Sequence, residues 1–272
     1  MIAGGDGLKS DHETKGSIVM NGGEVSISAG SDGAEAYKTI TINGGEVSIS
    51  AGSDGAEAYK TITINGGKLN ILKSYEGLES EAITINDGEI SIVSSDDGIN
   101  ISDSSSTTSE GMMHRNGTAS GRILTINGGK ITIDAGADGL DSNGAIEMNG
   151  GTVLVFGPTD NGNAALDYDE TFTMNGGTLL AFGSNGMAMN VSNGNQNSVL
   201  IGLSSQQNAG AKFSLVDSNG NMILEATPTK AWSSVVVSTA GLKLNSEYHY
   251  LVNGVEAGSF TLTSSVMSAG AS

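Results

Sequence analysis

An internal repeat without a single mismatch is the feature that most constrains the fold of this chain. Residues 21–42, NGGEVSISAGSDGAEAYKTITI, recur letter for letter as residues 43–64. An Asn-Gly-Gly or Asn-Asp-Gly triplet starts each further copy, and successive starts are 22, 22, 21, 41, 22 and 26 residues apart. A period in the twenties is typical of a solenoid, in which each unit stacks on its neighbours. The copies begin at Asn21, Asn43, Asn65, Asn86, Asn127, Asn149 and Asn175.

Within one copy, apolar residues alternate with polar ones, which indicates strands rather than helices. Asn-Gly-Gly and the later Asp-Gly step supply corners, because both sequences suit turns. We therefore predict an all-β fold, a parallel β-helix with coils of about 22 residues and three sheets. The side chains expected to point inward come in three pairs per coil, and in the first full copy they are Val25 and Ile27, Ala34 and Ala36, and Ile40 and Ile42.

The repeat pattern divides the chain into two predicted domains. Residues 1–197 form the β-helix, with a partial first coil at about 5–20 and a polar, Ser- and Gly-rich insertion at 102–121 that leaves the stack as a loop. From 198 to 272 the repeat is lost and alternating runs are separated by SNG and VNG, which are hairpin signals. We expect a small antiparallel β cap that covers the last coil.

The last coils carry apolar residues on both faces of a strand. Leu154 and Phe156, then Leu180 and Phe182, occupy positions that are polar in the early coils. A strand that is apolar on both faces needs cover on both, so we predict that the cap folds back over these residues. The alternative is an exposed platform for a sugar ring.

Composition limits the partners and the location of the protein. A formal net charge of −18 and a pI near 4.3 argue against nucleic acid or an anionic membrane as a partner. No apolar run is long enough for membrane insertion, and the absence of cysteine excludes disulfides. We expect an extracellular or cell-surface protein, although the chain itself contains no signal peptide. The opening MIAGGDGLKSD resembles a coil entered midway, so we expect that upstream sequence, such as a secretion signal, has been removed.

Two rows of acidic residues recur at fixed distances from the corner asparagines. Eleven residues after each corner, the row contains Asp32, Asp54, Glu76, Asp97, Asp138 and Asp160. Fourteen residues after each corner, the row contains Glu35, Glu57, Glu79, Asn100, Asp141 and Asn163.

Stacked carboxylates predict a bound cation. Equivalent residues of successive coils lie about 4.8 Å apart, where two carboxylates repel by roughly 3–4 kcal/mol at an effective dielectric constant near 20. None of the 12 Lys and Arg residues lies on the two rows as counted from the corners. Hard oxygen ligands at a corner suit Ca²⁺, although solvated turn carboxylates that align by chance are the alternative. The predicted calcium clusters are Glu76, Glu79, Asp96, Asp97 and Asn100; then Asp32, Glu35, Asp54 and Glu57; then Asp138 and Asp141.

The chain resembles a known family in two separate segments. SYEGLES at 74–80, followed one coil later by SSDDGINIS at 94–102, is similar to the carbohydrate-binding parallel β-helix family of cellulolytic clostridia. The closing segments FSLVDSNGNMILEATPTK and VNGVEAGSFTLTS resemble the C-terminal end of that family. The resemblance implies a secreted, calcium-binding, right-handed β-helix that binds cellulose and pectin-like polygalacturonate.

That family is similar in fold to the family 9 polysaccharide lyases. In those enzymes an Asp-Asp-Gly-x-Asp corner, together with an acid of the preceding coil, holds the catalytic Ca²⁺. The resemblance places Asp96, Asp97 and Asn100 on this corner and Glu76 on the preceding acid. Asn100 replaces an Asp of the motif and lowers the charge of the site, which weakens the expectation of lyase activity.

The function favoured by the sequence is a non-catalytic module that binds plant cell-wall polysaccharide. Ca²⁺ would bridge corner carboxylates of the protein and uronate carboxylates of the ligand. The first alternative is a calcium-dependent lyase similar to pectate lyases, which needs a base near the ion. The basic residues close in register are Lys73, Arg122 and Lys130, and Lys130 occupies an ordinary surface position.

Three further hypotheses follow from other features of the sequence. The duplicated coil is compatible with a fibre or adhesin built by end-to-end stacking, through self-association of an open N-terminal coil. Ice binding is a distant alternative because the Thr-Ile-Thr pattern lapses at Ala82 and Ile123. The insertion contains Met112, Met113 and His114, which could form a clasp over a ligand.

Overall fold

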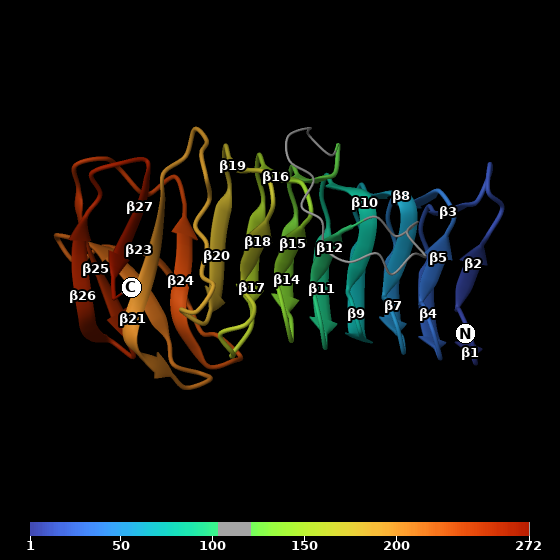
Figure 1. Ribbon diagram of the computed structural model, residues 1–272, viewed down its shortest axis with the longest axis horizontal. Coiled ribbons are helices and arrows are strands. Elements are labelled where there is room, and N and C mark those ends of the chain that lie inside the picture. The colour runs from blue at the N-terminus through green and yellow to red at the C-terminus, as the bar shows by residue number, and fades with distance from the viewer. Residues whose placement is uncertain (103–120, 272) are drawn as a thin grey trace.

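The computed structural model describes residues 1–102 and 121–271, and its regular elements are all β-strands. The described strands stack along one long axis, with the first coil at one end and the C-terminal strands at the other (Figure 1). The insertion at 102–121, with Met112, Met113 and His114, lies almost entirely outside the described residues. No helix of the described chain is long and apolar enough to cross a lipid bilayer.

One strand from each coil contributes to a parallel row on the first side of the solenoid. The pairing keeps a constant register from coil to coil, as for Val25, Val47 and Leu69, except for a shift near Lys73 and Ser74. The row consists of β1 (Ile2–Ala3), β4 (Glu24–Ala29), β7 (Glu46–Ser50), β9 (Lys68–Ser74), β11 (Glu89–Ser94), β14 (Lys130–Asp134), β17 (Thr152–Phe156) and β20 (Thr178–Gly183).

The other two strand rows join into a single sheet of 12 strands. We predicted three sheets, but β8 (Ala56–Ile64) and β10 (Leu78–Ile85) run through both rows without a break and connect them. The second row continues with β2 (Leu8–Ser10), β5 (Ala34–Ala36), β12 (Ile99–Ile101), β15 (Leu140–Ser142) and β18 (Leu166–Tyr168). The third row continues with β3 (Ser17–Met20), β6 (Thr39–Ile42), β13 (Ile123–Ile126), β16 (Ala145–Met148) and β19 (Phe172–Met174).

The inward-facing residues form one continuous core, as the alternating pattern predicts. Ile40 and Ile62 are in register and buried, and the alanine pair of each duplicated coil is buried in the same way. Val25 is the exception among the predicted inward residues because it is only partly buried. The stacked rows of Ile and Val therefore provide most of the apolar contact between coils.

A row of asparagine side chains runs along the corner that follows the third strand. Each amide nitrogen donates to the amide oxygen of the preceding coil, as from Asn43 to Asn21 at 2.8 Å and from Asn65 to Asn43 at 2.7 Å. The same bond joins the successive corners up to Asn195. The second glycine of the corner has a positive φ, 86° at Gly45, which explains why the sequence requires glycine there.

The strands after residue 197 form both an extension of the first row and a separate small sheet. β24 (Trp232–Ser238) pairs antiparallel with β20, and β21 (Ser198–Gln207) and β27 (Val266–Gly270) follow it in the same sheet. The small antiparallel sheet contains β22 (Phe213–Asp217), β23 (Met222–Ala226), β25 (Glu247–Val252) and β26 (Val255–Thr261), and the two hairpins predicted from SNG and VNG are confirmed.

A second hydrophobic core lies between the last coils and these C-terminal strands. Phe156 and Phe182 point outward from the coils and belong to this core together with Trp232. The rings of Phe182 and Trp232 meet edge to face, with centroids 5.2 Å apart. The apolar outer face of the last coils is therefore covered by the chain itself, and it does not provide an exposed platform for sugars.

We expect Ile62→Ala to lower the free energy of unfolding by about 2–5 kcal/mol, because it leaves a cavity in the stack between two neighbouring coils. Ile62 is buried in β8, whereas its neighbour Thr63 faces outward. Thr63→Ala is the matched control and should change stability by less than about 0.5 kcal/mol. Equal effects of the two substitutions in urea denaturation would contradict the assignment of inward and outward faces.

Candidate functional site

The acidic rows lie at the corner between the first and second strand rows, where the coils from Asp6 to Asp138 have an Asp-Gly or Glu-Gly step and the next coil has Ala164-Ala165. The amide of Gly33 donates to the carbonyl oxygen of Asp54 in the next coil at 2.8 Å. A Cβ atom at Gly33 would lie 2.2 Å from Cγ2 of Ile49 and 2.5 Å from the carbonyl oxygen of Gly55. The close approach of the coils therefore requires glycine here, and it fixes the acidic residue that precedes it.

Backbone amides hold one oxygen of several of these carboxylates in place. The amide of Asp54 donates to Oδ1 of Asp32 at 3.0 Å, and the amide of Glu76 donates to Oδ1 of Asp54 at 3.2 Å. The amide of Asp138 donates to Oδ1 of Asp97 at 2.9 Å in the same way. Each such carboxylate is thus directed toward the next coil by the fold and not by a chance choice of rotamer.

The result is a column of carboxylates, here called the acidic ladder. It contains five overlapping groups of three residues, and within each group one carboxylate oxygen of each residue lies within 4.8 Å of the other two. Each group is called a rung and is named by its position along the chain. The first to fifth rungs are Asp6, Asp32 and Glu35; Asp32, Asp54 and Glu57; Asp54, Glu76 and Glu79; Glu76, Asp96 and Asp97; and Asp97, Asp138 and Asp141.

The structure brings together all of the acidic residues predicted as calcium ligands, but it groups them differently. A carboxylate of one coil meets two carboxylates of the next, so Glu79 lies with Asp54 and Glu76 and not with Asp96 and Asp97. We predicted Glu35 to share a cluster with Asp32, Asp54 and Glu57, but it belongs to the preceding rung. Residues that we predicted as separate clusters therefore form one continuous ladder.

Two residues predicted to continue the rows are not part of them. The coil after Asn149 has extra residues, so counting from the corner selects Asp160 and Asn163, which bond to each other outside the row. The residue that pairs with Asp141 in the next coil is Asp167. A period of 26 in place of 22 was the signal that could have revealed this shift.

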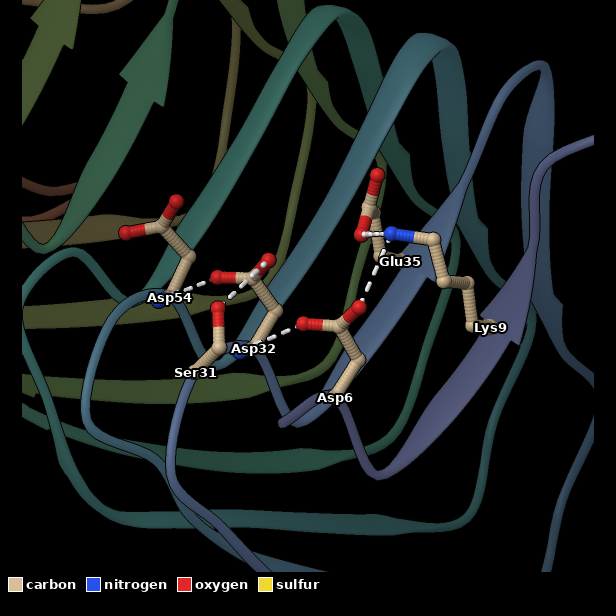
Figure 2. A network of polar contacts seen from close by, with 6 residues as sticks. All are labelled: Asp6, Lys9, Ser31, Asp32, Glu35 and Asp54. Atoms are coloured by element: carbon tan, nitrogen blue, oxygen red, sulfur yellow. Dashed lines mark hydrogen bonds and ion pairs between the residues drawn. The ribbon is translucent and has the colours of Figure 1, made fainter. Parts of the chain in front are cut away.

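The prediction that no basic residue lies on the rows is wrong, because Lys9 lies on the row of Glu35. Its ammonium group is 2.9 Å from Oδ2 of Asp6 and 2.6 Å from Oε2 of Glu35 (Figure 2). These hydrogen bonds to Glu35 and Asp6 raise the pKa of Lys9, so the side chain is a cation at neutral pH. Neither residue could be found by counting, since no corner asparagine precedes them, but Asp-Gly-Leu-Lys aligns with Asp-Gly-Ala-Glu at 32–35.

Asn100 contributes an unsatisfied oxygen beside the fourth rung. The side chain is 8% exposed, and its amide nitrogen donates to Oε2 of Glu76 at 3.0 Å. Its amide oxygen is buried without any hydrogen-bond partner in the described structure. A buried polar atom without a partner costs about 1–3 kcal/mol, so this oxygen indicates a missing partner that is a donor or a cation.

Burial and mutual repulsion strongly raise the pKa values of several ladder carboxylates. Burial, with the charge of Glu79 as the next cause, raises the pKa of Glu76 to about 9 and that of Glu57 to about 8. Burial raises the pKa of Asp54 and of Asp97 to about 7, and that of Asp141 to about 8. Without a cation these groups are driven to take up protons near neutral pH.

The chemistry of the ladder fits a hard divalent cation. Every rung provides carboxylate oxygens only, and Asn100 adds an amide oxygen next to one of them. Ca²⁺ prefers such oxygen donors, whereas the described ladder offers no nitrogen or sulfur ligand for a softer metal. Among the proposed catalytic bases, Lys130 lies in β14 in register with Glu89 of the first row and not at this corner.

A family model described as a carbohydrate-binding domain-containing protein matches residues 1–98. The matched segment covers the first three full copies of the repeat and most of the acidic ladder, from Asp6 to Asp97. No curated protein matches the chain in a sequence comparison. No solved structure matches it either.

We expect the stability of the metal-free protein to fall as the pH rises. The ladder carboxylates have raised pKa values in the folded state and ordinary values near 4 in the unfolded state, so between these values the folded state binds more protons. Their stabilising contribution is complete below about pH 4 and is lost as the pH passes through about 7 to 9.

The melting temperature in EDTA should therefore drop by several degrees between about pH 5 and about pH 8. Glu76→Gln removes one of these groups and should make the decrease smaller. A melting temperature that is constant or rises over this range would contradict the assignment of protonated carboxylates to the metal-free ladder.

Proposed function

We propose that the chain is a secreted, non-catalytic module that binds Ca²⁺ along the acidic ladder and, through it, polysaccharide of the plant cell wall. The observation that carries the proposal is the fourth rung, where a buried amide oxygen of Asn100 without a partner lies beside the carboxylates of Glu76, Asp96 and Asp97. The match of residues 1–98 to a carbohydrate-binding domain-containing protein supports the polysaccharide part.

Calcium at the fourth rung would remove two unfavourable features at once. Burial and the charges of neighbouring carboxylates raise the pKa of Glu76, and the positive charge of the ion would offset both effects. The amide oxygen of Asn100 would also coordinate the ion once the amide group rotates toward the rung and gives up its bond to Glu76. Asn100 would then act as a neutral ligand in a site that already has three carboxylates.

The charge of the protein decides how an acidic polysaccharide could bind. A chain with a net charge of −18 repels a polyuronate, so direct contact between the two sets of carboxylates is unfavourable. A Ca²⁺ ion on an exposed edge of the ladder has coordination positions left for ligand oxygens, because Ca²⁺ takes 6–8 of them. Pectin-like polygalacturonate is therefore the preferred ligand class, with the ion as the bridge.

Two tyrosines whose rings are in contact lie next to the ladder and offer apolar contact for a sugar ring. Tyr37 and Tyr59 follow the second strand row in adjacent coils, both are partly exposed, and their ring centroids are 5.2 Å apart. Burial and the charges of Glu57 and Glu35 raise the pKa of Tyr59. Aromatic rings with polar groups at their edge are common in sites that bind small polar ligands.

Neutral cellulose would depend on a different surface. The outer face of the first strand row has small polar side chains in register, including Ser26, Ser48 and Asn70, and ends where the C-terminal strands cover it. Such a face could donate hydrogen bonds to a flat glucan without any ion. Calcium dependence therefore separates the two ligand classes.

The calcium proposal predicts that Glu76→Gln and Asn100→Leu each weaken Ca²⁺ binding at least tenfold, since each removes a ligand oxygen from the fourth rung. Isothermal titration calorimetry of chelator-treated protein measures the affinity. Glu24→Gln, an exposed residue on the outer face of β4, is the matched control and should bind like the unmodified chain. Full affinity in both ladder variants would contradict the fourth rung as the calcium site.

The ligand proposal predicts retention on immobilised polygalacturonate in millimolar Ca²⁺ and loss of retention in EGTA. The double substitution Tyr37→Ala with Tyr59→Ala should weaken retention several-fold, while Met222→Ala, at an exposed apolar side chain of the small C-terminal sheet, serves as its control. Retention on cellulose that ignores EGTA would favour the neutral ligand instead. No absorbance of unsaturated uronate should develop on polygalacturonate, and its appearance would identify a lyase.

A further inference from the structure

The first two rungs of the ladder are a natural comparison inside one molecule. Both contain two aspartates and one glutamate with oxygens within 4.8 Å of one another. Asp32 with Glu35 and Asp54 with Glu57 come from the two identical copies of the repeat, so their local sequences do not differ. A difference between the rungs therefore comes from the residues of the coils before and after them.

The two rungs differ in the residue that pairs with their glutamate from the preceding coil. Lys9 is in register with Glu35, between β2 and β5. Glu57 has Glu35 in the coil before it and Glu79 in the coil after it, so both of its row neighbours are acids. The first rung is therefore the one in which a basic residue replaces a glutamate of the row.

The ammonium group of Lys9 lies where a cation would serve the first rung. It contacts a carboxylate of each of the two coils, at 2.9 Å from Oδ2 of Asp6 and 2.6 Å from Oε2 of Glu35, as Figure 2 shows. Asp6 in turn accepts a hydrogen bond from the backbone of Asp32 at 3.4 Å, the third residue of the rung. These are the contacts of a charge-assisted bridge between coils.

An ammonium group in this position opposes a second cation. Two positive charges a few ångströms apart repel each other, and the lysine already uses oxygens that a metal ion would need. A divalent ion would have to displace the lysine side chain before it could bind between Asp6 and Glu35. The second rung has no such competitor on its row.

We propose that Lys9 acts as a tethered cation that fills the first rung, so that this rung excludes divalent ions while the rungs above it, whose row neighbours are acidic or neutral, bind them. The inference rests on the proposed binding of Ca²⁺ by the ladder. In this proposal the bound Ca²⁺ ions begin at the second rung, because the side chain of Lys9 occupies the first.

Lys9→Glu tests the inference because it gives the first rung the same residues as the second. The variant should bind about one Ca²⁺ more per chain than the unmodified protein, measured as bound calcium by mass spectrometry of the metal after equilibrium dialysis. Its melting temperature in EDTA should fall, and Ca²⁺ should raise it by more than it raises that of the unmodified protein. Lys15→Glu makes the same change in net charge at an exposed lysine away from the ladder and should add no ion.

The outcomes separate the inference from the proposed function. If the unmodified protein binds Ca²⁺ and Lys9→Glu binds no more, the role of Lys9 is wrong and the calcium ladder stands. If neither protein binds Ca²⁺, the calcium ladder itself is wrong, and the inference falls with it. An extra ion in Lys15→Glu as well would show a general effect of charge and would also overturn the inference.

A second variant covers the case in which Lys9→Glu does not fold. Lys9→Gln removes the ammonium group but keeps all three carboxylates of the first rung. It should also bind about one additional Ca²⁺, since the competitor is gone and the oxygens remain. A Lys9→Gln protein that is folded by circular dichroism and binds the same number of ions as the unmodified chain would overturn the proposal.

Discussion

The stacking of coils in register is the constraint on which the rest of the structure depends. Because pairing is parallel and the register is constant, a side chain meets its own counterpart one coil away, about 4.8 Å along the axis. In the duplicated coils, like therefore meets like in every row. Isoleucine on isoleucine and tyrosine on tyrosine are favourable contacts, and asparagine on asparagine forms a hydrogen bond. Carboxylate on carboxylate is an arrangement that stacking alone makes unfavourable.

This conflict distinguishes the acidic ladder from ordinary turn carboxylates. A solvated carboxylate at a corner can turn away from its neighbour, but backbone amides of the next coil hold Asp32, Asp54 and Asp97 in place. Two of these aspartates, Asp32 and Asp54, are also less than 9% exposed. The fold therefore positions negative charges where water screens them poorly, and such an arrangement is retained more readily where a cation completes it.

The sequence was informative where the period was constant and misleading where it changed. The inward rows, the glycine corners and the two C-terminal hairpins follow from local patterns of two or four residues, so they could be predicted. On the row of Asp141, counting from the corner selected Asn163 where the structure has Asp167, because the additional residues of that coil lie between the corner and the row. Asp6 and Lys9 were not predicted as members of the rows, because the count started at asparagine corners and none precedes them. The union of two strand rows through β8 and β10 depends on backbone curvature, which alternation does not encode.

The asparagine row at the other corner has a direction along the solenoid. Every amide uses its nitrogen toward the lower-numbered coil and its oxygen toward the higher-numbered one, from Asn21 to Asn195. The row is thus a one-way chain of donors, and replacing one amide by a carboxylate would affect its two neighbours unequally. An aspartate in place of Asn86 could still accept from Asn127, but it would face the oxygen of Asn65 with an oxygen of its own. Chemical damage at one corner would therefore loosen the solenoid on one side of that coil only.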